Sequence, residues 1–101
     1  MRLNHNKMNQ TITQEKLEKY FSITKEALDM AKDKFDSSRL ADAEDFFDMA
    51  SRYYSDAEHF FSKDDWVNAF AALNYAHGWL DAGARIRLFQ VNDSRLFTVD
   101  E

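Results

Sequence analysis

Apolar residues recur at alternating steps of three and four along three long segments of this chain, and such steps align side chains on one face of an α-helix. The first stripe consists of Leu17, Phe21, Thr24, Leu28, Ala31 and Phe35. The second consists of Leu40, Ala43, Phe47, Ala50, Tyr54, Ala57 and Phe61, and the third of Trp66, Phe70, Leu73, His77, Leu80, Ala84, Leu88 and Val91. Sustained steps of this kind favour neighbouring helices that cross at about 20°.

Two short polar clusters, at residues 36–38 and 62–65, separate the three segments and contain residue types that begin helices. Clusters this short join antiparallel neighbours rather than separate domains. We therefore predict an all-α fold, an up-and-down antiparallel three-helix bundle with a left-handed twist. The helices are expected at 13–35, 39–62 and 65–91 within one domain at 11–91, between a flexible N-terminal tail at 1–10 and a C-terminal tail at 92–101. Leu96, Phe97 and Val99 are the residues suited to hold that second tail against the bundle.

The composition excludes several classes of protein. Proline is absent and glycine occurs twice, which argues against a turn-rich all-β fold. The absence of cysteine excludes disulfide frameworks, thiolate zinc sites and cysteine nucleophiles. A net charge of −5 argues against a nucleic-acid partner.

Polar residues also argue against a membrane partner. The most apolar stretch, 66–91, contains six strongly polar or charged residues, which a membrane-spanning helix would not tolerate. Residues 1–10 lack the apolar core of a signal peptide. We therefore expect a cytoplasmic location.

Acidic residues concentrate in the middle of the chain. Residues 38–65 contain eight acidic and three basic residues. Such a run is usually a solvated helix face. The alternative is a docking surface for a basic partner, such as a larger enzyme.

The third segment is apolar or small nearly all round, which is typical of a helix that is buried on every side. Two partner helices cannot cover all of it, so we predict a homodimer that forms through this helix. Gly78 and Gly83 favour close approach by another element, and the alternative is that both serve helix contacts within the bundle. The predicted interface residues are Tyr75, Gly78, Trp79, Ala82, Ile86 and Phe89.

One polar line interrupts the third segment at steps of three and four: Asn74, His77, Asp81 and Arg85. One interpretation is a structural network of mutually bonded side chains. The alternative is a functional site along these residues that binds a small ligand or a metal, or that catalyses a hydrolysis. No glycine-rich phosphate loop or catalytic signature is present, so we assign no catalytic residue, bound metal or cofactor, and the chain is interpreted as a non-enzymatic interaction or assembly module.

Roughly residues 15–91, and most specifically 54–89, resemble a family of archaeal proteins, domain of unknown function family 357. Its first pattern, Y-x-D-A-x-x-F, falls on Tyr54, Asp56, Ala57 and Phe60, and its second, Y-A-x-G-x-L-D-A, falls on Tyr75, Ala76, Gly78, Leu80, Asp81 and Ala82. The resemblance implies a short three-helix bundle of archaeal cytoplasmic origin with no assigned activity. It also implies an accessory role, because relatives carry the domain beside a nucleotidyltransferase-like enzyme domain.

Overall fold

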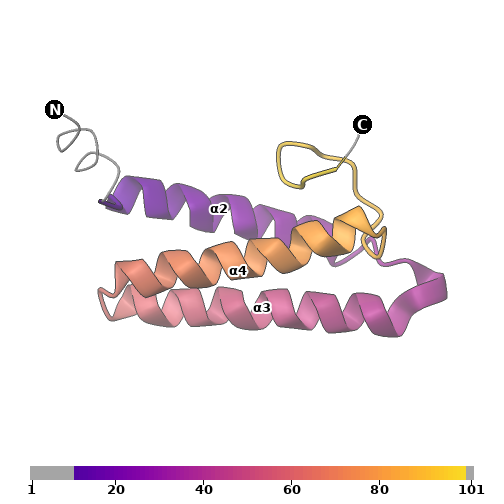
Figure 1. The fold of residues 1–101 in the computed structure, drawn as a ribbon, viewed down its shortest axis with the longest axis horizontal. Coiled ribbons are helices and arrows are strands. Elements are labelled where there is room, and N and C mark those ends of the chain that lie inside the picture. Colours follow the sequence, from indigo (N-terminus) through magenta and orange to yellow (C-terminus); the bar gives the residue numbers. More distant parts are fainter. Residues whose placement is uncertain (1–10, 100–101) are drawn as a thin grey trace, which may run out of the picture.

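The computed structural model describes residues 11–99, and three long helices run side by side in this part of the chain (Figure 1). They are α2 at Gln14–Ala31, α3 at Leu40–Ser62 and α4 at Trp66–Arg85, with a short 3₁₀ turn, η1, at Ser37–Arg39 before α3. Successive helices reverse direction, so the predicted all-α three-helix bundle is confirmed. The predicted tail at 1–10 lies outside the described residues.

Side-chain caps begin α2, η1 and α4, and those of η1 and α4 come from the two polar clusters, whereas α3 has no side-chain cap. The Thr13 hydroxyl accepts a hydrogen bond from the Lys16 backbone N–H at 3.1 Å, and the Asp65 carboxylate accepts one from Asn68 at 3.2 Å. Asp36 caps η1 in the same way through Ser38, at 3.0 Å. Each cap satisfies a backbone donor that the first turn leaves unpaired.

The helices α2 and α4 end earlier than the stripes predicted, at Ala31 instead of 35 and at Arg85 instead of 91. At the end of α4, Arg87 takes a left-handed backbone conformation with φ of 65°. The N–H of Leu88 then donates to the Gly83 carbonyl at 2.8 Å, and that of Arg87 to the Ala84 carbonyl at 3.1 Å. This is a Schellman turn, which closes a helix and reverses the chain.

The residues beyond these two ends pair with each other instead of continuing the helices. Phe35 and Phe89 form an isolated antiparallel bridge. The N–H of Asp36 donates to the Leu88 carbonyl at 2.8 Å, and the N–H of Gln90 donates to the Lys34 carbonyl at 2.7 Å. The bridge ties the α2–α3 connection to the segment that follows α4.

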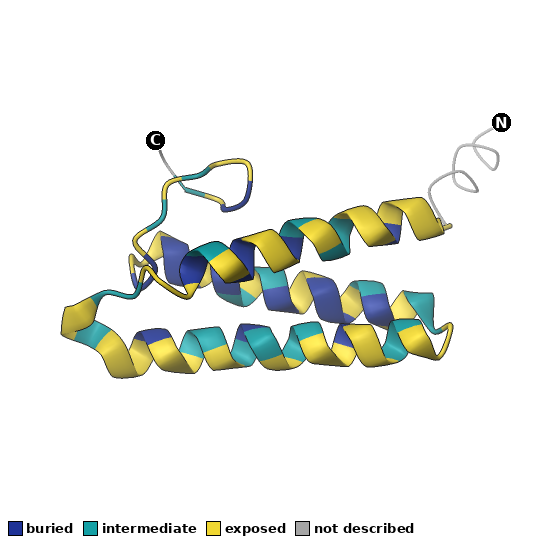
Figure 2. Ribbon diagram, turned by 180° about the vertical axis from the view of Figure 1, so that it is seen from behind, coloured by how far each residue is buried: buried dark blue, intermediate teal, exposed yellow. Residues whose placement is uncertain are grey.

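Small and branched side chains fill the core along the contacts between α4 and the other two helices (Figure 2). The aromatic doublets of α3 divide between two neighbours. Phe46 packs on Trp79 of α4, whereas Tyr54, two turns further along, packs on Phe21 of α2. A helix with an aromatic face this wide can therefore contact both of its neighbours.

The segment after α4 folds back beside α2 and α4 (Figure 1). We call residues 93–99 the strap; Leu96 and Phe97 in it are buried, and Val99 is half-buried. The strap is part of the predicted C-terminal tail, and its hydrogen bonds attach it to α2 and α4. Within residues 11–99, no helix has the length and hydropathy needed to cross a membrane.

Candidate functional site

One side of α4 remains uncovered by the other helices. Its residues line a shallow hollow of about 520 Å³, and we call this surface the outer face. The lining residues are Ala71, Asn74, Tyr75, Gly78, Trp79 and Ala82. None of these residues carries a charge, and all but Asn74 are apolar or aromatic, so the outer face is largely apolar.

Large apolar side chains extend the outer face in both directions along α4. Val67 is 72% exposed, Tyr75 62% and Ile86 49%, whereas ordinary core residues of this helix are buried. With Ala71, Gly78 and Ala82 they form one stripe at steps of three and four. A contiguous apolar stripe of this kind marks an interaction surface more often than scattered exposed residues do.

Aromatic contacts with α3 hold the two large side chains of the outer face in place. Tyr75 stacks on Tyr53 with ring centroids 4.7 Å apart and planes 11° apart. Trp79 meets Phe46 edge to face, with centroids 5.0 Å apart. Because these pairs fix the rings before any partner arrives, a contact through them loses less conformational entropy.

The two glycines of α4 have different surroundings. A Cβ atom at Gly83 would collide with the ring of Phe89, 2.6 Å from Cδ2 and closer still to Cε2. A Cβ atom at Gly78 would meet nothing within 4 Å. Packing inside the protein therefore explains Gly83 and leaves Gly78 without an intramolecular reason.

The structure separates the predicted interface residues. Tyr75, Gly78, Trp79 and Ala82 lie on the outer face, and Ile86 lies exposed at its end. Phe89 does not belong with them, because it is 1% exposed and packs in the core. The prediction placed it on a helix that continued to 91, whereas the Schellman turn folds it back over Gly83.

The two middle residues of the polar line, His77 and Asp81, face α2 and the strap. The Leu96 carbonyl lies 2.6 Å from Nε2 of His77 and can only accept, so Nε2 carries the proton. The Thr24 hydroxyl therefore donates to Nδ1 of His77 at 3.1 Å. The Asp81 carboxylate accepts from the N–H and hydroxyl of Thr98 at 2.8 and 3.2 Å.

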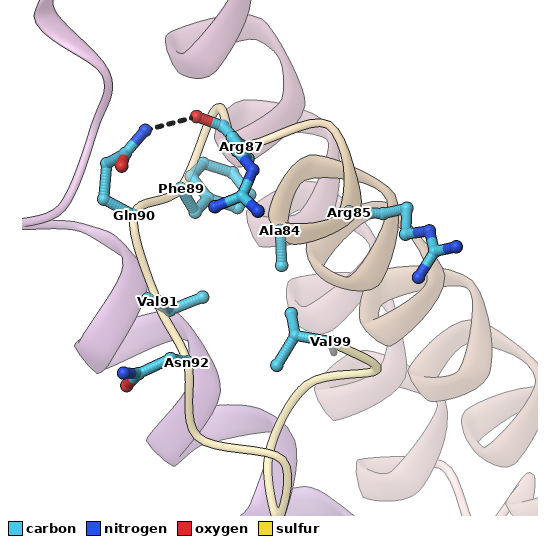
Figure 3. Close-up of a pocket in the computed structure, with 8 residues that line it drawn as sticks. All are labelled: Ala84, Arg85, Arg87, Phe89, Gln90, Val91, Asn92 and Val99. Carbon is cyan, nitrogen blue, oxygen red and sulfur yellow. Dashed lines mark hydrogen bonds between the residues drawn. The ribbon is translucent and has the colours of Figure 1, made fainter. Parts of the chain in front are cut away.

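The two ends of the polar line are exposed. Asn74 lies at the edge of the outer face, and Arg85 lines a separate hollow of about 340 Å³ at the end of α4. Figure 3 shows that the side chains of Arg85 and Arg87 extend in different directions there, while Val91 and Val99 project from separate segments. Asn74, His77 and Asp81 line one hollow of about 390 Å³ together with Arg95 of the strap, whereas Arg85 lines the other hollow.

No metal centre emerges from the acidic and histidine side chains between residues 11 and 99. No group of three or more of them is placed to hold an ion. His77 uses both ring nitrogens in hydrogen bonds to protein atoms. A metal ligand would need one of those nitrogens free.

Arg95 of the strap forms an ion pair with Glu26 of α2, donating to both carboxylate oxygens at 3.1 and 2.6 Å. These hydrogen bonds hold the pKa of Glu26 below its ordinary value of 4.5, although partial desolvation acts in the opposite direction. A carboxylate whose pKa is lowered by folding stabilises the folded form above its unfolded pKa, and that contribution is lost as the pH falls through the folded pKa.

We therefore expect Glu26→Gln to weaken attachment of the strap only where Glu26 is ionised. Protection of the strap amides in hydrogen-exchange NMR should fall by less than about tenfold near pH 6, because exposed ion pairs contribute little. The difference from the wild type should disappear below the folded pKa of Glu26. Asp29→Asn is the control, because Asp29 pairs with Lys25 instead; an equal loss in both variants would contradict the prediction.

Within residues 11–99, the fold is an all-α bundle with an exposed apolar surface on α4. Residues 19–89 match the family described as a protein of unknown function (DUF357), and the chain belongs to this family. The match includes the three helices from the second turn of α2 onward and stops before the strap. No curated protein and no solved structure matches the chain.

Proposed function

We propose that this protein is a non-enzymatic interaction module that self-associates as a homodimer through the outer face of α4. The observation that carries the proposal is Gly78. A glycine inside a helix costs about 1 kcal/mol relative to alanine, and nothing within the protein occupies the space that its missing side chain leaves. Close approach of another backbone would use that space.

The outer face is suited to contact with a copy of itself. Gly78, Tyr75 and Trp79 line the same hollow, so the surface offers both a cavity and large side chains that could fill one. In a two-fold contact each copy presents the same surface to the other. Tyrosine and tryptophan are also the residues that most often dominate the energy of an interface.

Charge favours a second copy over a strongly charged partner at this surface. The six residues that line the outer face are uncharged, so two copies can meet there without burying like charges. Asn74 can pair with its counterpart across the two-fold axis, since an amide both donates and accepts. The face spans a helix about 30 Å long, which suits an interface near the lower limit of about 1,200 Å² for a specific dimer.

Light scattering on a sizing column over a concentration series tests the proposal. The wild type should show the mass of a dimer that dissociates on dilution. Gly78→Leu and Trp79→Asp should each raise the dissociation constant by at least about tenfold, since one fills the cavity and the other places a charge in an apolar contact. Ser55→Leu, an exposed position on α3, is the control and should keep the wild-type constant.

Two results would overturn the proposal. One is a wild type that stays monomeric throughout the series, and the other is a dimer that both outer-face variants leave intact. Salt provides a further distinction. Because each copy carries a net charge of −5, added salt should strengthen self-association. Docking of the acidic α3 on a basic partner, such as a nucleotidyltransferase-like enzyme, would weaken with salt instead.

A further inference from the structure

The strap is organised by its own hydrogen bonds rather than by a regular helix or strand. The Asp93 carboxylate accepts from the Arg95 N–H at 2.9 Å. The Asp93 carbonyl accepts from the N–H groups of Leu96 and Phe97 at 3.1 and 2.9 Å. An Asx turn of this kind forms within a few residues and does not depend on the rest of the fold.

Two apolar side chains attach the strap to the bundle. Leu96 and Phe97 are buried and belong to the same core cluster as Leu80 and Ala84 of α4. The bundle thus offers a groove between α2 and α4 that two consecutive apolar residues fill.

Side chains of α4 also recognise the main chain of the strap. His77 donates to the carbonyl of Leu96, and Asp81 accepts from the N–H of Thr98 two residues later. Glu26 adds a contact that is specific for the side chain of Arg95. Main-chain hydrogen bonds combined with apolar pockets are how protein grooves bind extended peptides.

The groove and its occupant belong to different parts of the chain. Glu26, His77 and Asp81 lie within the segment that matches the family, whereas the strap lies beyond its end at residue 89. We propose that the groove between α2 and α4 is a peptide-binding site and that the strap is its displaceable occupant.

The contacts specify the peptide that the site accepts. It carries an acidic turn residue, a basic residue two positions later, two consecutive apolar residues and then a threonine or serine. A tethered strap competes at an effective concentration in the millimolar range. A peptide from another protein therefore binds only when the strap has left, so the strap regulates access to the site.

Hydrogen exchange in the wild-type chain tests whether the strap leaves the groove. The amides of Leu96, Phe97 and Thr98 should show protection at least about tenfold lower than the slowest amides of α4, because local opening needs less free energy than global unfolding. Equal protection in the strap and in the slowest part of α4 would overturn the proposal, since the strap would then open only when the whole protein unfolds.

Peptide binding to the full-length protein tests the site itself. The probe is a fluorescent peptide with the sequence of residues 92–99, and binding is read by anisotropy. A chain with Leu96→Ser and Phe97→Ser should bind it at least about tenfold more tightly than the wild type, whose own strap competes. Adding Asp81→Asn to that chain should weaken binding by about tenfold, because a charged acceptor is lost.

Two controls make the peptide experiment decisive. The far-ultraviolet circular dichroism of each variant must match that of the wild type, and Asp29→Asn in place of Asp81→Asn should leave binding unchanged. Failure of the double variant to bind up to about 1 mM, the range of a tethered competitor, would overturn the proposal. So would equal binding by the wild type and the double variant.

Discussion

Phe89→Ala is expected to lower the free energy of unfolding by about 3–5 kcal/mol, which is the range for removing a buried aromatic ring. Phe89 is among the largest fully buried side chains of the described residues. Its ring centroid lies 5.6 Å from that of Phe35 and 6.3 Å from that of Phe47. The ring thus links the α2–α3 connection, α3 and the end of α4, and its loss would leave a cavity among them.

Urea denaturation followed by circular dichroism measures this loss. Val67→Ala is a matched control at protein concentrations where the wild type is monomeric, because it truncates a residue that is exposed in the monomer and should change the free energy by no more than about 0.5 kcal/mol. The slope of the free energy against urea should stay the same in both variants if unfolding remains two-state. A cost below about 1 kcal/mol for Phe89→Ala would mean that the ring is not part of the core.

Alanine should have opposite effects at the two glycines of α4. At Gly78 the new methyl group meets nothing, so Gly78→Ala should stabilise the monomer by up to about 1 kcal/mol through helix propensity. At Gly83 the methyl group would overlap the ring of Phe89, which cannot move away because Phe35 and Phe47 enclose it. Gly83→Ala should therefore destabilise the protein by about 1–3 kcal/mol.

The comparison is made by urea denaturation at protein concentrations where the wild type is monomeric, so that self-association does not contribute. A double-mutant cycle with Phe89→Leu isolates the cause at Gly83. The smaller side chain should remove part of the cost of Gly83→Ala, and this coupling should exceed about 0.5 kcal/mol. Destabilisation of similar size at both glycines would contradict the assignment of Gly78 to an open surface.

The positions of the helices and their buried faces could be predicted from the sequence because both depend on local periodicity. The stripe residues Leu17, Ala50, Leu73 and Leu80 are all buried, as steps of three and four predict. The caps at Thr13 and Asp65 follow from residue type. These features are encoded within a few turns of one segment, so no distant partner is needed to specify them.

The ends of the helices were predicted less well, because their signals are weak in the sequence. Both α3 and α4 close with Schellman turns in which a non-glycine residue, Asp64 or Arg87, takes a positive φ. Sequence reasoning expects glycine at that position. The apolar stripe also continues past the true end of α4 to Leu88 and Val91, which pack in the core from a turn instead of a helix.

The outer face was predicted from the excess of small and apolar residues around α4, and four of its proposed contact residues lie on it. The attachment of His77 and Asp81 to the strap was not predicted as a pair of specific contacts. Nothing near positions 77 and 81 in the sequence specifies which carbonyl or N–H they meet, because Leu96 and Thr98 reach them from beyond α4.

The sequence by itself determined that this chain forms three amphipathic helices and that α4 has more apolar surface than two neighbours can cover. Only the tertiary structure decided what covers each part of that surface. Gly78 and Gly83 are the same residue in the same helix, yet one faces open space and the other faces the ring of Phe89. That difference depends on the chain reversal at Arg87, four residues after Gly83, which brings Phe89 back onto the helix. A contact between residues that a turn brings together does not show in the periodicity of the sequence.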